Sequence, residues 1–184
     1  MIIIDNISIV VGIFASIVTI LASVNFVRER TGISWKTVDT CTKQTITAIQ
    51  QSGFHPELVV GVGRGGAILA GMLAGNLGHV PLFVVDTVLD RSDGMSTVHV
   101  RFPNLLPDLD GKRVLLAVGE LYSGEDLRAV LQTIKATSPT AQIKTVSLFT
   151  HPATSIKPDF VGRETRQPLS APWRMSDVYR ARRL

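Results

Sequence analysis

The chain has very little cysteine, and this excludes two common kinds of small protein. Its 184 residues contain a single cysteine, Cys41, so an internal disulfide framework cannot form. The four histidines are scattered and stand at no spacing typical of a zinc site. We therefore expect no metal held by the protein's own side chains, and the lone thiol fits a reducing compartment.

A strong charge imbalance is also missing. The 19 Lys and Arg residues oppose 15 Asp and Glu residues, which gives a formal net charge of +4. This excess is too small to argue for nucleic acid, and no nucleic-acid partner is expected. Basic residues gather toward the C-terminal end, where residues 180–184 could touch anionic lipid, although a solvated tail is the simpler interpretation.

Charge is absent altogether from residues 7–27, which form one apolar run. A helix of this length spans roughly 31 Å and matches the hydrocarbon core of a bilayer. No positive charge precedes the run, unlike in a signal peptide, whereas Arg28, Arg30 and Lys36 follow it. We predict a single-pass anchor within residues 1–30 and a cytoplasmic domain over 31–184, at the inner or plasma membrane. A buried core helix is the alternative.

The most informative stretch is 113–131, R-V-L-L-A-V-G-E-L-Y-S-G-E-D-L-R-A-V-L. Residues 114–118 are apolar without alternation, which is typical of a parallel strand covered on both faces. After a glycine turn, apolar residues recur at the spacing of one helix face: Leu127, Val130, Leu131 and Ile134. A strand, glycine turn and helix in this order aim free N–H groups and a positive helix end at a phosphate.

A second pattern of the same kind covers residues 58–76. Residues 58–62 predict a buried strand, and residues 67–76 predict the helix behind it. The turn between them permits positive φ and close approach of an anion, and its arginine can form a bidentate contact. The residues predicted to bind the anion are Gly63, Arg64, Gly65 and Gly66.

The remaining patterns predict shorter elements around these two. Ser34 is a plausible N-cap for a helix over 35–51, which Gly53 ends. Polar residues 87–97 predict a loop. The other expected segments are a strand at 81–85, an edge strand at 98–102, a connector at 103–112 and a strand at 142–149.

These patterns resemble the type I phosphoribosyltransferases. Residues 113–131 are similar to the family's phosphoribosyl-diphosphate (PRPP) loop, V-L-L-V-D-D-x-x-x-T-G-x-T-L. The sequence F-H-P-E-L-V-V-G-V-G-R-G-G resembles the opening of purine-type members, and K-P-D-F-V-G-R-E with A-P-W resembles their base-covering hood. The resemblance covers about residues 31–175. It implies an α/β fold with a central, mainly parallel sheet flanked by helices and a small C-terminal hood.

The resemblance also implies roles for individual residues. The turn at 63–66 would be the pyrophosphate loop, which meets the leaving diphosphate. Phe160 and Trp173 would stack on a base, with simple packing of the hood as the alternative. Mg²⁺ is implied only if PRPP is bound. The residues of the implied phosphate loop are Tyr122, Ser123, Gly124, Glu125 and Asp126.

The sequence departs from the family where the sugar and its phosphate would sit. The two acidic residues that hold the ribose hydroxyls fall on Val118 and Gly119. Glu120 is then the only acidic candidate for catalysis, and it would need a bulge because neighbouring strand side chains face opposite ways. Asp126 replaces the threonine that contacts the 5′-phosphate, and with Ser123 it is predicted to form a capping box that satisfies the helix end.

These departures favour a membrane-anchored, catalytically degenerate relative that binds a nucleotide, a PRPP-like ligand or a protein partner. An active enzyme that moves ribose 5-phosphate from PRPP to a purine-like base is one alternative. A dinucleotide-binding protein is another, because Gly61 to Gly66 match G-x-G-x-x-G and Asp86 follows about 20 residues later. A third is an assembly subunit that forms a homo-oligomer or joins another membrane protein.

Overall fold

The computed structural model describes residues 16, 33–90, 97–101, 106–166, 169 and 171–173. The chain divides into two units, Ser34–Pro168 and Met1–Ile33 with Leu169–Leu184. Among the described residues, no helix has both the length and the apolarity needed to cross a bilayer. The predicted anchor at 7–27 lies outside the described residues except for Ser16, so it stays a prediction, as does a domain boundary after residue 30.

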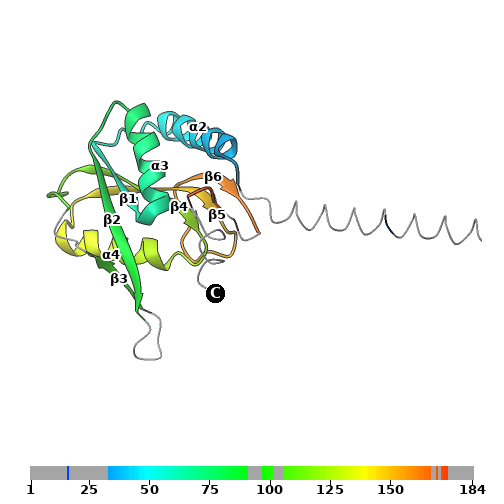
Figure 1. Cartoon of the computed structure of the whole chain (residues 1–184). Coiled ribbons are helices and arrows are strands. Elements are labelled where there is room, and N and C mark those ends of the chain that lie inside the picture. Colours follow the sequence, from blue (N-terminus) through cyan, green and yellow to red (C-terminus); the bar gives the residue numbers. More distant parts are fainter. Residues whose placement is uncertain are drawn as a thin grey trace, which may run out of the picture. The chain divides into compact units, whose positions relative to one another are not determined.

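The unit Ser34–Pro168 contains a six-stranded sheet in the order β3-β2-β1-β4-β5-β6, with helices on both faces (Figure 1). All neighbouring strands are parallel except β2 and β3, so the predicted α/β fold with a mainly parallel sheet is confirmed. The elements are α2 (Trp35–Gln51), β1 (Leu58–Val62), α3 (Gly63–Asn76), β2 (Leu82–Asp90), β3 (Thr97–Arg101), β4 (Arg113–Leu121), α4 (Glu125–Thr137), β5 (Gln142–Thr150) and β6 (Phe160–Glu164).

The helices form two layers, with α2 and α3 over one face of the sheet and α4 over the other (Figure 1). Every residue of β1 is buried, as expected of a strand covered on both sides. On the α4 side, apolar residues of β1 and β4 pack against the buried face of the helix: Leu58, Val60, Val62, Val114, Leu116, Val118, Leu127, Val130 and Ile134.

The topology places both predicted phosphate turns at one edge. β1 and β4 are parallel neighbours, so their carboxyl ends lie side by side. The helices that follow them, α3 and α4, cover opposite faces. In open α/β sheets a crevice forms where successive helices leave in opposite directions, and ligands bind there. The N-termini of α3 and α4 therefore flank the natural ligand site of this fold.

Glycines extend two elements beyond their predicted limits. β4 continues to Leu121 instead of ending near residue 118, and α3 begins at Gly63 instead of residue 67. The cause is backbone packing, because a Cβ placed on Gly119 would lie 2.6 Å from the Cα of Gly65. Because glycines have no side chain, the backbones of β4 and α3 can touch. The glycines therefore belong to the strand and the helix themselves, and not to the loops that we expected.

The loop expected at residues 87–97 is replaced at both ends by strands, because residues 87–90 belong to β2 and Thr97 begins β3. Residues 91–96 lie outside the described part of the chain. β2 pairs with β1 from Leu82 to Val85 and with β3 from Asp86 to Asp90. Its second half therefore leaves the parallel part of the sheet and forms an antiparallel ladder with β3. Polar side chains are tolerated in this half because its residues are exposed or half-buried, and none is fully buried.

Residues 160–164 were expected in a hood, but they form β6 at the edge of the sheet. Asp159 holds the start of this strand in register. Its carboxylate accepts hydrogen bonds from the Thr145 backbone N–H and hydroxyl, each at 2.8 Å, and from Lys144 Nζ at 2.7 Å. Pairing of β5 with β6 begins at the next residues, Val146 and Phe160, so Asp159 satisfies the last strand amide that β6 does not reach.

The single cysteine lies in the seam between α2 and β6. Cys41 is 3% exposed, and a Cβ on Gly162 would lie 3.1 Å from its own Cβ. Burial raises the pKa of the Cys41 thiol and outweighs the lowering effect of Arg163. The thiol is therefore protonated near neutral pH and packs as a small apolar group.

Replacement of Asp159 by asparagine tests the anchor of β6. Burial alone would raise the pKa of Asp159, but the bonds from Lys144 and Thr145 lower it below the ordinary value. The stabilisation is thus complete above about pH 4 and is lost as the pH falls through the lower, folded value. We expect Asp159→Asn to lower the free energy of unfolding by about 1 kcal/mol at pH 7, a modest figure because the pair is partly exposed.

Urea unfolding of the full chain at pH 7 and pH 3 measures this effect. The matched control is Asp39→Asn, which breaks an exposed i,i+4 pair with Lys43 and should cost at most about 0.5 kcal/mol. An Asp159 effect that is equally large at both pH values would contradict the assignment.

Candidate functional site at the carboxyl edge of the sheet

The N-terminus of α3 offers an open anion site. Val62 is the N-cap without a side-chain bond, Gly63 has φ +62°, and the first turn contains no acidic residue. The first N–H groups of a helix have no partner inside the helix, and its N-terminus carries partial positive charge. Arg64 is exposed, and among the described residues it forms no ion pair. This end can therefore receive a phosphate or diphosphate group.

Three glycines let this helix end approach the strands closely. A Cβ on Gly61 would lie 2.7 Å from the carbonyl oxygen of Gly66, and a Cβ on Gly66 would strike the carbonyl oxygen of Ala117. Gly119 lies against Gly65 in the same way, with Cβ distances of 2.6 Å to its Cα and 2.7 Å to its carbonyl carbon. Position 119 therefore has no room for a carboxylate, which gives a packing reason for the absence of the second family acid.

The other missing acid falls in the core. Val118 is 5% exposed and belongs to the apolar cluster beneath α4. Glu120 follows it on the same side of the strand, since side chains alternate, and both its carboxylate oxygens are buried. The register of β4 with β5 is unbroken through the pair Glu120 and Phe149. Without a bulge, Glu120 therefore shares the face of position 118, where the first family acid would project, and not that of position 119. It is the acidic candidate in this loop.

The phosphate loop before α4 has a different cap from the predicted one. The N-cap of α4 is Gly124, with φ +86° and no side-chain hydrogen bond. Ser123 Oγ accepts from the Glu125 backbone N–H at 3.3 Å, not from residue 126. The capping box predicted from Ser123 and Asp126 is therefore wrong, because the glycine takes the cap position and shifts the helix start by one residue.

Asp126 reaches across to another strand. Its Oδ1 accepts a hydrogen bond of 2.8 Å from the Thr87 hydroxyl on β2. Both acidic residues of the first turn, Glu125 and Asp126, are exposed. At an effective dielectric near 20, the repulsion between a carboxylate and a phosphate charge about 5 Å away is roughly 3 kcal/mol. The attraction of a helix N-terminus for the same phosphate charge is only about 0.3–1 kcal/mol. A phosphate that came this close to either carboxylate would be repelled, and the first turn of α3 has no such charge.

The segment after β5 supports the phosphate loop, and sequence patterns did not reveal it. The carbonyl oxygen of Ser123 accepts from the Ser155 N–H at 3.2 Å and from its hydroxyl at 2.8 Å. Arg128 donates to the same hydroxyl at 2.8 Å. A Cβ on Gly124 would lie 2.9 Å from Thr154 Oγ1. The only available signal was topological, because the ends of β4 and β5 are paired and their loops must meet.

Tyr122 and His151 come next to each other at this edge. Their ring centroids are 6.2 Å apart with a tilt of 33°. His151 Nδ1 accepts from the Ala153 N–H at 3.1 Å, so a neutral imidazole carries its proton on Nε2. Tyr122 was predicted for this loop and His151 was not.

The two predicted base-stacking residues are not brought together within one unit. Phe160 is 8% exposed and begins β6 on the side of the sheet that α2 covers. Phe160 therefore packs in the protein interior. It lies four residues before Glu164, where β6 ends at the carboxyl edge. Trp173 belongs to the other unit. Stacking by either residue stays a prediction.

The site does not fit a metal held by the protein alone. Mg²⁺ prefers several oxygen ligands in octahedral geometry. Among the described residues, no group of three or more His, Cys, Asp or Glu side chains could hold a metal ion. At this edge, neither Val118 nor Gly119 has a side-chain oxygen. A Mg²⁺ ion at these two positions would therefore be coordinated by water or by oxygens of a bound ligand.

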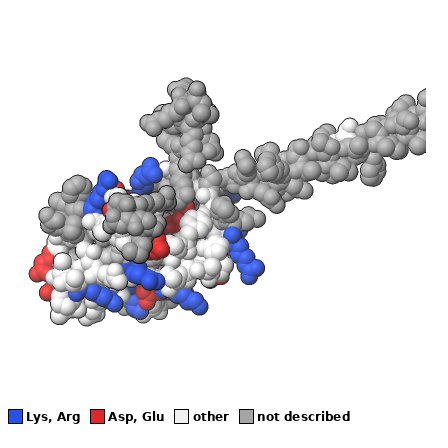
Figure 2. Space-filling model, turned by 90° about the horizontal axis from the view of Figure 1, so that it is seen from below, with Lys and Arg blue, Asp and Glu red and all other residues white. Residues whose placement is uncertain are grey.

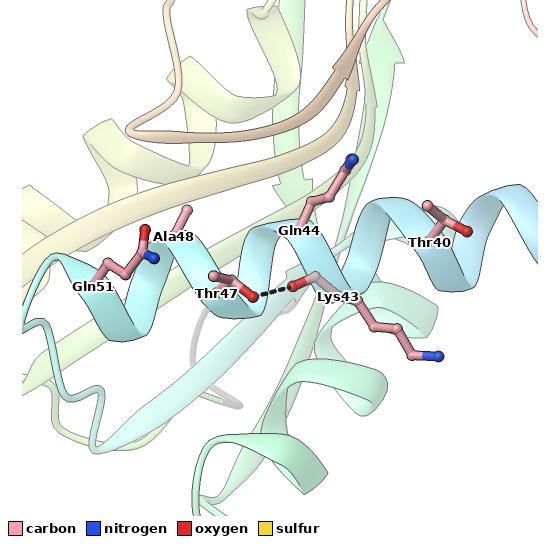
Figure 3. A pocket seen from close by; sticks show the side chains of 6 residues that line it. All are labelled: Thr40, Lys43, Gln44, Thr47, Ala48 and Gln51. Atoms are coloured by element: carbon pink, nitrogen blue, oxygen red, sulfur yellow. Dashed lines mark hydrogen bonds between the residues drawn. The ribbon is translucent and has the colours of Figure 1, made fainter.

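A surface hollow of about 420 Å³ lies elsewhere, on the outer side of α2 (Figure 3). Its lining comes from this one helix: Thr40, Lys43, Gln44, Thr47, Ala48 and Gln51. Ligand sites usually bury most of a ligand between several elements, and one convex helix cannot do so. In the face shown in Figure 2, acidic and basic side chains are interspersed over mostly uncharged surface. Neither the hollow on α2 nor the charge distribution on this face indicates a second ligand site as well formed as the carboxyl edge.

Comparison with known families decides between the interpretations of this edge. The model of the phosphoribosyl transferase domain matches residues 23–181. The chain belongs to the phosphoribosyltransferase family. The fold agrees, because β3 is antiparallel to β2, whereas the dinucleotide-binding fold has the same strand order with parallel strands. A comparison with curated protein sequences gives no match.

Solved structures support the same family. A purine phosphoribosyltransferase from Pyrococcus horikoshii is 27% identical with a TM-score of 0.72, over 79% of this chain and 94% of that one. A Helicobacter pylori xanthine-guanine-hypoxanthine phosphoribosyltransferase is 19% identical, with a TM-score of 0.65 over 82% and 97%. A hypothetical protein from Neisseria gonorrhoeae with bound ppGpp is 20% identical, with a TM-score of 0.66 over 83% and 93%.

Replacement of Gly119 by alanine tests the contact between β4 and α3 in this phosphoribosyltransferase fold. The added methyl group must displace the Gly65 backbone, and we expect a loss of about 2 kcal/mol in the free energy of unfolding. Gly71→Ala is the matched control, because that helical glycine has nothing within 4 Å of an added Cβ. The control should be neutral or stabilising by up to about 1 kcal/mol. Urea denaturation compares them, and equal effects would refute the close contact.

Proposed function

We propose that the carboxyl edge binds a phosphorylated ligand of the purine-nucleotide class, with a diphosphate-type group at the N-terminus of α3, and that it does not transfer a ribose phosphate. The observation that carries this proposal is the contrast between two helix ends. The first turn of α3 has Arg64 and no acidic residue, whereas that of α4 has Glu125 and Asp126. A ligand with one strongly charged end fits this arrangement.

The ribose position supports binding without transfer. Family members hold the ribose hydroxyls with two acidic residues, and here one position is buried in the core while the other lies against Gly65. The purine class is supported by the similarity to the Pyrococcus horikoshii enzyme. Guanosine diphosphate, a purine nucleotide with a diphosphate at one end only, is therefore a suitable probe.

Active transfer from PRPP to a purine-like base is the second candidate, and the comparisons favour it over a site that only binds. Its chemistry is displacement: a base nitrogen forms a bond to the anomeric carbon as the bond to diphosphate breaks. Glu120 is the acidic residue that this candidate would use, and its buried oxygens lie on the strand that ends at the phosphate loop.

Titration calorimetry of the full chain with pyrophosphate and with guanosine diphosphate tests the diphosphate site. We expect both to bind and Arg64→Ala to weaken them about tenfold, because a charge-assisted bidentate contact is lost. Lys43→Ala is the control, since it removes the same charge from the outer side of α2. Failure of the unmodified protein to bind either probe, or equal weakening by both variants, would refute this site.

An incubation with PRPP, Mg²⁺ and guanine, hypoxanthine or xanthine distinguishes the two candidates. We expect no nucleoside monophosphate in the products. Its formation by the unmodified chain, with loss on Glu120→Gln, would establish the transferase instead.

We further propose that residues 7–27 anchor the protein in the inner or plasma membrane with the phosphoribosyltransferase domain in the cytoplasm. The support is the uncharged run and the basic residues that follow it. In cell fractionation, the full chain should stay in the membrane pellet after an alkaline wash, and a chain that starts at Thr31 should not. Digestion of the domain by a protease added outside intact cells would contradict the orientation.

A further inference from the structure

One hydrogen bond links the phosphate loop to a distant strand. Thr87 lies on the half of β2 that pairs only with β3, opposite Val100. Asp126 lies in the first turn of α4. The Thr87 hydroxyl donates to Asp126 Oδ1 at 2.8 Å, and α4 also packs against β3 (Figure 1). The bond therefore fixes a negative charge beside the helix end and ties the β2–β3 ladder to α4.

We propose that Asp126, held by Thr87, determines which ligands the site accepts by excluding a phosphate monoester from the N-terminus of α4. The inference rests on the proposed function, and it narrows the ligand class to compounds with a diphosphate-type group at α3 and no phosphate at the α4 end. The carboxylate belongs to the first turn of α4, the end where the helix dipole would favour an anion. A phosphate brought there would be repelled by a charge that cannot swing away without breaking the bond to Thr87.

The neighbouring acid does not act in the same way. Glu125 is exposed, and within the described part of the chain its side chain forms no hydrogen bond or ion pair, while its N–H is bonded to Ser123 Oγ. It is free to turn toward solvent, where its repulsion is screened. The two residues carry the same charge in the same helical turn. Comparing the variants Asp126→Asn and Glu125→Gln therefore separates the effect of a carboxylate held by a hydrogen bond from that of a carboxylate free to move.

Binding of ribose 5-phosphate, a phosphate monoester, tests the exclusion by calorimetry on the full chain. We expect no measurable binding by the unmodified protein and a gain of about tenfold or more in Asp126→Asn. Glu125→Gln should gain about twofold. Equal gains in both variants, or none in Asp126→Asn, would overturn the proposal.

The role of Thr87 has its own readout. Thr87→Val keeps the carboxylate charge and removes only the donor, so amide hydrogen exchange in Thr97–Arg101 should accelerate about fivefold. Unchanged exchange would show that the bond does not hold the ladder. Pyrophosphate is titrated in parallel: its failure to bind refutes the diphosphate site, whereas failure of the ribose 5-phosphate gain refutes the exclusion by Asp126.

Discussion

The contact between the backbones of Gly65 and Gly119 constrains the rest of the site. It brings the first turn of α3 against the end of β4, at a distance that no side chain at position 119 would permit. One contact thus has two consequences. It presents the N–H groups of α3 at the carboxyl edge, and it removes a position where the family carries an acid. The close approach of α3 and the lack of room for a side chain at position 119 therefore have the same origin.

The two helix ends at this edge have become chemically unequal. One has an arginine and no capping side chain, and the other has two carboxylates and a bond to β2. The helix dipoles alone would give both N-termini a similar attraction for anions. The difference in charge comes from side chains in the first turn of each helix.

Much of this fold could be predicted from the sequence, because apolar runs and helical spacing report burial directly. The limits of β1 and α2 agree with the patterns. The limits of α3 and β4 do not, since a glycine has the same appearance in sequence whether it forms a turn or a backbone contact. The partner of Asp126 could not be predicted either, because Thr87 is distant in sequence and only the register of β2 brings it near.

The position of Cys41 has a practical consequence. Its thiol is protonated and shielded between α2 and β6, so an alkylating reagent can reach it only when that helix separates from the edge of the sheet. No second cysteine exists to confuse the signal. The rate at which Cys41 is alkylated therefore reports the rate at which α2 separates from β6, and it can be measured on the unmodified chain.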